Sequence, residues 1–291
     1  MKNKHYLFLL IIFISFIAMK SGKPAYNLFN AKGKSAKYND LVKDAEKADV
    51  ILFGELHNNP ISHWLQLELT RDLHADLGQK LVLAAEMFEA DNQLLLDEYV
   101  AGTIRQKNFE DEAKLWKNYA TDYKPLVEFA KENKLKFVAS NIPRRYASIV
   151  HQRGFEGLDS LPQEAKRYIA PLPIAYDPEL PGYKSMIEMM SGMGGGHANE
   201  NLPKAQAIKD ATMAHFILEN RQEGQVVLHY HGTYHSNNFE GIYWYLKNQY
   251  PNLNILTIAS VEQEETDSLT SENSNLADYT ICVPATMTKT Y

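Results

Sequence analysis

The segment Asp49–Leu77 (DVILFGELHNNPISHWLQLELTRDLHADL) predicts a strand, a sharp turn and a helix in immediate succession. The continuous apolar run Val50–Phe53 is typical of a strand buried on both faces of a parallel sheet. Gly54 ends this run, and the Asn-Asn-Pro sequence that follows it is typical of a helix start. We therefore expect Glu55 and His57 in the turn at the carboxyl end of the strand, which is the edge where open α/β sheets bind ligands.

A second copy of this turn lies far away in the chain. Gly54–His57 has the pattern Gly-x-x-His, and Gly232–His235 repeats the pattern after another apolar run, Val226–Leu228. One such tetrapeptide is weak evidence of function. Two copies, each at the end of an expected strand, favour a site that contains a pair of histidines.

Apolar runs of strand length alternate with segments of helical periodicity along the chain. The expected strands cover 50–53, 80–85, 136–140, 225–230, 254–259 and 279–283. Such alternation predicts an α/β fold with a mainly parallel sheet flanked by helices. We expect a single domain over 26–291, with helical insertions at about 90–130 and 155–200 that cover the carboxyl edge of the sheet.

Polar side chains able to do chemistry follow four of the expected strands. They are Glu55 with His57, Glu86, Asn141 with Arg144, and His231 with His235. Singly, each residue is more simply explained as a helix cap or as a histidine bonded to a loop carbonyl. Because adjacent parallel strands end at the same edge of a sheet, these groups are together expected to meet in one crevice.

One further carboxylate comes from the helix expected over 203–221. Gln206, Asp210, Met213 and Ile217 are spaced i, i+4, i+7 and i+11, so they share one helical face. This face either points inward or forms a partly exposed boundary. In the inward case the buried carboxylate of Asp210 needs a partner, and Arg144 and the histidines are nearest by topology.

Four methionines form a stripe in the second insertion. Met186, Met189, Met190 and Met193 are spaced i, i+3, i+4 and i+7, and Gly194–Gly196 and His197 follow. The usual role of such a stripe is to pack in the core. Methionine also lines adaptable surfaces for large apolar ligands, so a hinged methionine helix beside a histidine would suit a flat ligand such as haem.

The N-terminal segment 1–25 has the pattern of a secretory signal. It has a basic start and an apolar run over 7–19, which is too short for a typical membrane span, and it offers cleavage sites after Ala18 or Ala25. An uncleaved membrane anchor is the competing interpretation. Cys282 is the only cysteine, so we expect neither a lipid anchor on the leader nor an intrachain disulfide. The expected location is the periplasm or cell envelope.

Five segments of the chain resemble the ChaN family of bacterial haem-binding proteins. They are GELHNNPISHWLQLEL, AAEMFEADNQLLLDEY, ASNIPRRYASIV, QAIKDATM and HGTYHSNNFEGIYWYL, and they occur in this order between about 49 and 260. The wider superfamily includes the Tiki proteases and the erythromycin esterases. Its two Gly-x-x-His motifs correspond here to Gly54 with His57 and Gly232 with His235. The resemblance implies an α/β core with a helical excursion, although the missing leader cysteine departs from the many ChaN lipoproteins.

The resemblance also implies how haem is bound. ChaN-like proteins are thought to hold haem by a tyrosine supported by a histidine, with two haems between the subunits of a homodimer. Tyr146 in NIPRRY is the best match for this tyrosine, while Tyr168, Tyr176 and Tyr183 stay open. The implied role is haem or iron uptake in the envelope, together with an outer-membrane haem/iron transport system.

Haem binding is the first of two functional hypotheses. Haem iron accepts His, Tyr or Met ligands, the methionine stripe would contact the ring, and an arginine would pair with the propionates. The cofactor-binding residues expected under this hypothesis are Tyr146, Arg144, His197, Met189, Met190 and Met193. The acidic balance of the chain, with a net charge of -6 and a pI near 5.9, argues against a nucleic-acid partner.

A hydrolase is the alternative hypothesis, which the superfamily makes plausible. Its catalytic residues would be Glu55, His57, Glu86 and His235. They would activate water directly, or His57, His235 and Asp210 would hold a divalent metal ion. Because the sequence contains no HExxH motif and no recognisable Ser-His-Asp arrangement, the haem hypothesis ranks first.

Overall fold

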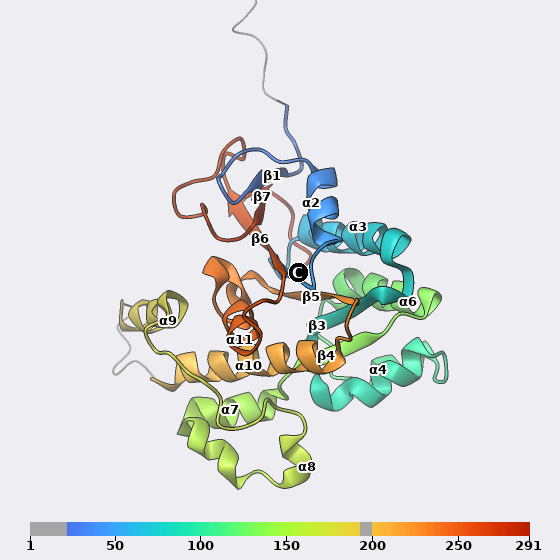
Figure 1. The fold of residues 1–291 in the computed structure, drawn as a ribbon, viewed down its shortest axis with the longest axis vertical. Helices are drawn as coiled ribbons and strands as arrows, with labels where there is room; N and C mark the ends of the chain where they lie inside the picture. The colour runs from blue at the N-terminus through green and yellow to red at the C-terminus, as the bar shows by residue number, and fades with distance from the viewer. Residues whose placement is uncertain (1–21, 193–199) are drawn as a thin grey trace, which may run out of the picture.

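The structure, a computed structural model, describes residues 22–192 and 200–291. A seven-stranded sheet in the order β1-β7-β6-β2-β5-β3-β4 forms its centre, and every neighbouring pair is parallel except β1 with β7 (Figure 1). The strands are β1 (Asn27–Asn30), β2 (Val50–Glu55), β3 (Leu81–Glu89), β4 (Phe137–Asn141), β5 (Val226–Gly232), β6 (Ile255–Gln263) and β7 (Tyr279–Pro284). The predicted fold class, a mainly parallel sheet flanked by helices, is confirmed.

Helices connect the parallel strands except β6 and β7, which a loop joins. They are α2 (Tyr38–Ala45), α3 (Pro60–Leu77), α4 (Gln93–Val100), α5 (Gln106–Glu112), α6 (Lys124–Asn133), α7 (Arg144–Arg153), α8 (Gln163–Lys166), α9 (Pro181–Gly192), α10 (Asn201–Asn220) and α11 (Ile242–Gln249). The start of α3 shows how the sequence sets such a boundary. Asn59 caps the helix by accepting hydrogen bonds from the backbone N–H groups of Ile61 and Ser62, and Pro60 opens the first turn.

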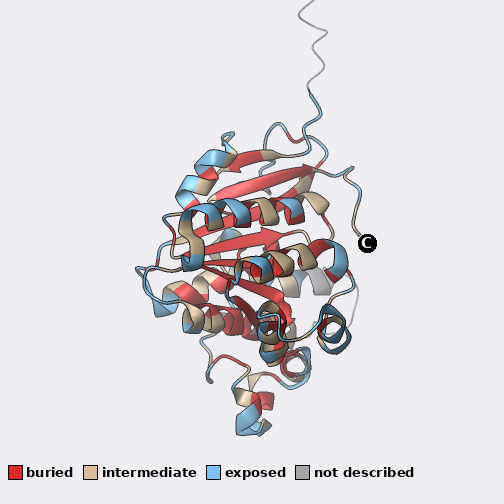
Figure 2. Cartoon of the chain, turned by 90° about the vertical axis from the view of Figure 1, so that its right-hand side faces the viewer, coloured by how far each residue is buried: buried red, intermediate tan, exposed pale blue. Residues whose placement is uncertain are grey.

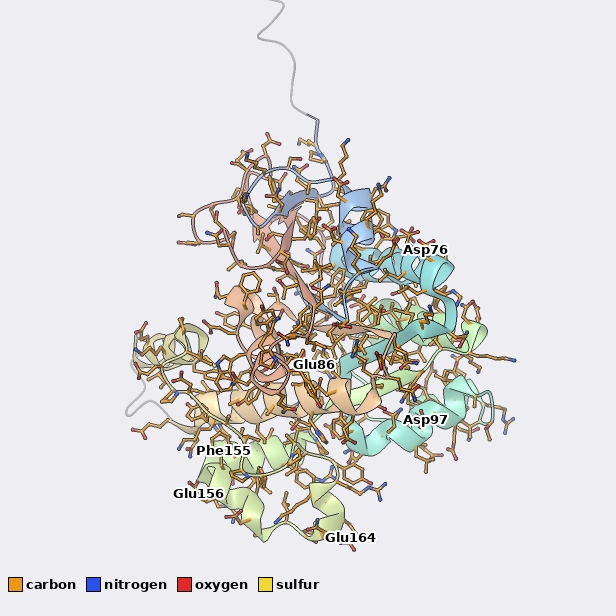
Figure 3. The ribbon with its side chains drawn as sticks, viewed as in Figure 1. Asp76, Glu86, Asp97, Phe155, Glu156 and Glu164 are labelled. Atoms are coloured by element: carbon orange, nitrogen blue, oxygen red, sulfur yellow. The ribbon has the colours of Figure 1, made fainter. Side chains whose placement is uncertain are left out.

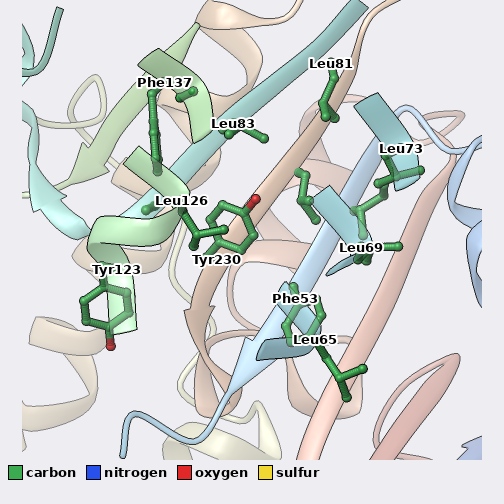
Figure 4. Close-up of a cluster of buried hydrophobic side chains, with 14 of the residues drawn as sticks. Phe53, Leu65, Leu69, Leu73, Leu81, Leu83, Tyr123, Leu126, Phe137 and Tyr230 are labelled. Carbon is green, nitrogen blue, oxygen red and sulfur yellow. The ribbon is translucent and has the colours of Figure 1, made fainter. Parts of the chain in front are cut away.

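The strands are buried because both faces of the sheet are covered (Figure 2). In β2, Ile51 and Phe53 pack in the larger core with residues of α3 and α6 (Figure 4), whereas Val50 and Leu52 pack against α10 and α11. Successive side chains of a strand point to opposite faces, so one apolar run serves two cores. Each fully buried Leu, Ile or Phe contributes about 1.5–3 kcal/mol of hydrophobic free energy, which makes β2 a rigid support for the turn that follows it.

The sheet has one strand that the sequence pattern does not predict. Strand β1 lies in a segment that is polar overall, and it pairs antiparallel with β7 at the edge of the sheet. Only Leu28 and Phe29 of this short strand are buried, so its apolar signal is two residues long. Within residues 22–192 and 200–291, no helix is both long enough and apolar enough to span a membrane.

The two stretches expected as insertions are largely helical. The first forms α4, α5, a π-helical turn at Tyr119–Tyr123 and α6, and the second forms α8 and α9. Trp116 of the first stretch and Met186 of the second line the same cavity as the ends of β2 and β5. Both stretches therefore contribute walls at the carboxyl edge of the sheet.

Candidate functional site

The carboxyl ends of β2, β3, β4 and β5 meet at a cavity of about 580 Å³. The cavity is lined by Glu55, Leu56, His57, Glu86, Glu89, Trp116, Asn141, Ile142, Arg144, Met186, Gln206, Lys209, Gly232, Thr233, Tyr234 and His235. The strand-end residues predicted to gather in one crevice are all in this set except His231. Glu86 lies near the middle of the molecule in the view of Figure 3.

The two Gly-x-x-His turns interlock because β2 and β5 are neighbours in the sheet. A Cβ atom on Gly54 would lie 2.8 Å from the backbone Cα of Thr233 in the other turn. A Cβ atom on Gly232 would lie 2.7 Å from the ring of His57. Each glycine is thus the point where the opposite turn packs closely, which explains why the motif begins with this residue.

His57 is oriented by a carboxylate behind it. Its Nδ1 lies 2.9 Å from Oε1 of the buried Glu55, and the same carboxylate accepts hydrogen bonds from Tyr123 (2.6 Å) and Gln66 (2.6 Å). The His57 side chain remains 38% exposed, and its ring stands edge-on to Trp116 with 5.0 Å between the ring centres. The hydrogen bond at Nδ1 leaves Nε2 as the ring nitrogen available to a ligand.

The charge of His57 depends on two opposing effects. Burial disfavours the protonated ring, but the hydrogen bond to Glu55 and the charges of Glu86 and Glu55 outweigh it and raise the pKa of His57 above its usual value. Its backbone is also held, because the carbonyl oxygen accepts from the amide of Asn118 (2.9 Å) and lies 3.0 Å from Nε2 of His63. The turn therefore presents His57 in a fixed position.

His235 occupies the corresponding position in the second turn but is almost fully buried. Its Nδ1 lies 2.5 Å from Oδ1 of Asp210, and its Nε2 lies 3.2 Å from Oε1 of Glu86. Burial acts against the charge, but the two carboxylates dominate and raise the pKa of His235 to about 10. His235 in turn holds the pKa of Glu86 well below its usual range despite burial. A protonated imidazole between two carboxylates therefore forms the floor of the cavity.

The burial of Asp210 decides whether the helical face that carries it points inward or forms a partly exposed boundary. Asp210, Met213 and Ile217 are buried and Gln206 is partly buried, so this face of α10 points inward. His235, and not Arg144, is the partner that the buried carboxylate requires. The adjacent residues His229 and His231 lie deeper, outside the cavity lining.

His229 and His231 form a buried pair beneath the floor. Their Nδ1 atoms are 3.0 Å apart, and their Nε2 atoms lie 2.8 Å from the hydroxyl groups of Ser140 and Ser236. Burial lowers the pKa of His229 to about 3 and holds that of His231 well below its usual value. Both rings are therefore neutral, and they serve as core histidines satisfied by hydrogen bonds.

Two cations line the cavity. Arg144 at the start of α7 and Lys209 of α10 line the cavity, yet neither forms an ion pair within the part of the chain that the structure describes. The buried side-chain oxygen of Asn141 in the same lining also lacks a hydrogen-bond partner there. These groups are free to bind an anionic ligand that also offers a hydrogen-bond donor.

No three or more His, Cys, Asp or Glu side chains among the described residues are arranged to hold a metal ion. His57, His235 and Asp210, predicted as metal ligands, form no such group. Asp210 instead bonds His235, and His57 bonds Glu55. The metal site therefore stays a prediction.

Of the residues predicted to bind haem, the structure describes the side chains of Arg144 and Tyr146, which lie in different places. Arg144 lines the cavity, but Tyr146 is buried in a separate apolar cluster and its hydroxyl accepts a hydrogen bond from Arg145 (3.0 Å). Met189 and Met190 lie on α9 with side chains outside the described part, and Met193 and His197 lie outside the described residues altogether. Met186, the stripe residue whose side chain the structure describes, lines the cavity.

Several residues of the cavity lining were not predicted, among them Lys209, Tyr234 and Trp116. Lys209 lies three positions after Gln206, and the same helical stripe would have found it. Tyr234 is the third residue of the second Gly-x-x-His motif and is 58% exposed. Its place inside the motif is the sequence signal that could have found it. Trp116 comes from an insertion without a strong pattern, and no signal in the sequence marks it.

The fold and the cavity define an α/β protein with a polar cavity at the carboxyl edge of its sheet, built on two interlocked Gly-x-x-His turns. The chain belongs to the family described as haem-binding uptake, Tiki superfamily, ChaN, whose model matches residues 41–246. The resemblance read from the sequence is thereby confirmed. A comparison with curated proteins produced no match.

Solved structures from Campylobacter jejuni and Bacillus cereus share this fold. The ChaN protein of Campylobacter jejuni, described as binding haem cofacially, aligns with a TM-score of 0.67 and 21% identity over 88% of this chain and 96% of its own. A Bacillus cereus protein aligns with a TM-score of 0.50 and 12% identity over 89% of this chain and 94% of its own. An erythromycin esterase in its open conformation has a TM-score of 0.49 at 10% identity, over 89% of this chain and 97% of its own.

Proposed function

We propose that the cavity at the carboxyl edge of the sheet binds haem. The observation that supports this proposal is that one cavity of about 580 Å³ combines apolar surface with side chains able to bind a metal centre. Trp116, Met186 and Tyr234 give it aromatic and apolar surface, and His57 presents a partly exposed imidazole. Haem needs such a combination, because it is a flat apolar ring around an iron that accepts nitrogen, oxygen or sulfur ligands.

The charges of the cavity lining also fit this ligand. Haem carries two propionates, and Arg144 and Lys209 have no carboxylate partner among the described residues. His57 would hold the iron through Nε2, since Glu55 occupies Nδ1. When bound, haem would supply an iron centre whose properties depend on its ligands and on the polarity around them. Tyr146 stays an alternative ligand.

Haemin titration is the direct test. Wild-type protein should develop a Soret band, and His57→Ala should weaken haemin binding at least about tenfold, in line with the loss of a ligand or its support. His215→Ala removes a histidine from a different cavity and serves as the matched control. A Soret band of equal position and affinity in all three proteins would contradict the assignment of His57 and leave Tyr234 or Tyr146 as the ligand.

We further propose that haem binding serves uptake at the cell envelope. The family description names haem-binding uptake, and the leader pattern in 1–25 is that of an exported protein. The proposed partners are a second copy of the chain and an outer-membrane haem/iron transport system.

Hydrolysis is a second candidate function, and one observation favours it. The cavity holds two histidine–carboxylate pairs, His57 with Glu55 and the protonated His235 with Glu86. A neutral His57 could take a proton from water attacking an ester carbonyl, while His235 and Arg144 stabilise the negative charge that develops. This arrangement needs no haem.

Ester hydrolysis by haem-free protein tests this candidate. If His57 is the base, His57→Ala should lower kcat/KM for a chromogenic ester by about 100-fold. Because the pKa of His57 is raised, the rate should fall on the acid side of a correspondingly raised midpoint. Parallel assays with a chelator and with added divalent metal decide whether a metal takes part. If the ester is hydrolysed no faster with the protein than in buffer alone, in every assay, hydrolysis is excluded as a function of this cavity.

A further inference from the structure

Tyr183 links a wall of the cavity to the charged centre at its floor. It lies in the first turn of α9, and its hydroxyl donates a hydrogen bond to Oδ2 of Asp210 at 3.0 Å. The other oxygen of the same carboxylate lies 2.5 Å from Nδ1 of His235. One carboxylate is thus shared between a tyrosine of α9 and a histidine of the second Gly-x-x-His turn.

Asp210 depends on both of these partners. Its side chain is 1% exposed, so bulk water does not solvate either oxygen. A buried carboxylate is stable only when hydrogen bonds replace its hydration, and a lost partner allows it to rotate. Since the Oδ1 atom faces His235, the hydroxyl of Tyr183 is the group that fixes the second oxygen and therefore the plane of the carboxylate.

Tyr183 is itself held firmly. It is 4% exposed, and its ring stacks on Tyr176 with 5.7 Å between ring centres and 29° between planes. The preceding backbone N–H of Gly182 donates to the carboxylate of Glu240 at 2.7 Å, which fixes the start of α9. Three residues after Tyr183, the same helix carries Met186 into the cavity lining.

We propose that Tyr183 is a positioning residue with two effects. Through Asp210 it fixes the ring of His235 at the cavity floor, and through α9 it fixes the wall that carries Met186. The inference goes beyond haem binding, because it concerns the geometry of the cavity and holds for any ligand. Because Met186 and Tyr183 lie on the same helix, a ligand that displaces Met186 would also strain the hydrogen bond between Tyr183 and Asp210.

The simpler explanation is that Tyr183 only fills space between α9 and α10. Tyr183→Phe separates the two explanations, because it keeps the ring and removes the hydroxyl. Tyr176→Phe is the matched control: it removes a hydroxyl from the ring stacked on Tyr183 without touching Asp210. Both variants should remain folded by far-UV circular dichroism.

The test combines two measurements on the full protein. Histidine-labelled NMR should show the Nδ1 proton of His235 far downfield in wild type and in Tyr176→Phe, and shifted or exchange-broadened in Tyr183→Phe. Amide hydrogen exchange at 183–188 should accelerate about tenfold in Tyr183→Phe, as expected for one lost hydrogen bond to a charged group. Unchanged signals in Tyr183→Phe on both measurements would overturn the proposal.

Hydrogen exchange in the variant Asp210→Asn is a second, independent test of the proposal. It decides the question even if Tyr183→Phe does not fold. Replacing the carboxylate should accelerate exchange in α9 as Tyr183→Phe does, although Asp210 lies on α10. Where both single variants fold, the double variant should exchange no faster than Asp210→Asn, since the two residues act through one bond. An α9 helix that is unaffected by Asp210→Asn, or additive effects in the double variant, would overturn the link.

Discussion

Acidification from pH 7 to pH 5 should destabilise the protein by about 2 kcal/mol through His229 alone, because a group that is neutral when folded takes up a proton when unfolded. Burial lowers the pKa of His229 to about 3 in the folded protein. The ordinary value near 6.5 applies to the unfolded chain. Below pH 6.5 the unfolded state therefore binds more protons, and stability falls with pH until about pH 3. His231, shifted in the same direction, adds to this loss.

Urea unfolding at pH 7 and pH 5 measures this effect. Three other shifted groups act in the opposite direction: the stability that His235 and His57 gain from their raised pKa is complete only below pH 6.5, and the raised pKa of buried Asp210 also favours the folded state on acidification. Their gain offsets part of the loss, equally in the wild type and in variants of His229. Stability contributed by Glu86 is lost only at lower pH. His229→Gln should remove at least half of the net loss of stability, whereas His215→Gln, at a half-buried histidine, should leave most of it. A change in stability between pH 7 and pH 5 that is the same in His229→Gln as in the wild type would contradict the neutral burial of His229.

The sheet was predictable because its strands are continuous apolar runs. Those of β2, β3 and β5 begin with the runs Val50–Phe53, Leu81–Ala85 and Val226–Leu228, which are apolar throughout because both faces of the sheet are covered, so the pattern cannot be mistaken for an amphipathic helix. The unpredicted strand β1 lies at an edge, and two of its four residues are only half-buried. With only two buried apolar residues, β1 leaves little signal in the sequence, unlike the other edge strand, β4, which is buried over most of its length and was predicted.

The sequence predicts which residues gather at the edge of the sheet, but it does not predict which hydrogen bonds and ion pairs each of them forms. Topology alone places Glu55, Glu86 and His235 at one edge, whereas the direction of each side chain depends on local geometry. Near the start of α7, successive residues point about 100° apart around the helix. Arg144 consequently lines the cavity while Arg145 binds Asp91 outside it, and no spacing rule distinguishes them.

Alanine at the two motif histidines should have very different effects on stability, although both occupy the fourth position of the same motif. His235→Ala leaves the buried carboxylates of Glu86 and Asp210 without their cation and should cost about 3–5 kcal/mol. His57→Ala should cost less than about 1 kcal/mol, because its side chain is 38% exposed and Glu55 keeps two hydrogen bonds from other residues.

Urea unfolding of both variants at pH 7.5 tests this contrast. Adding Asp210→Asn to His235→Ala should recover part of the loss, since it removes one of the two uncompensated charges. Equal and small losses would show that no charged triad forms at the cavity floor. The expected asymmetry also assigns a role to each turn: the buried His235 holds the charges of the floor together, which leaves the exposed ring of His57 free to bind a ligand. His57→Ala is for this reason the variant in which a change of ligand binding can be separated from a change of fold.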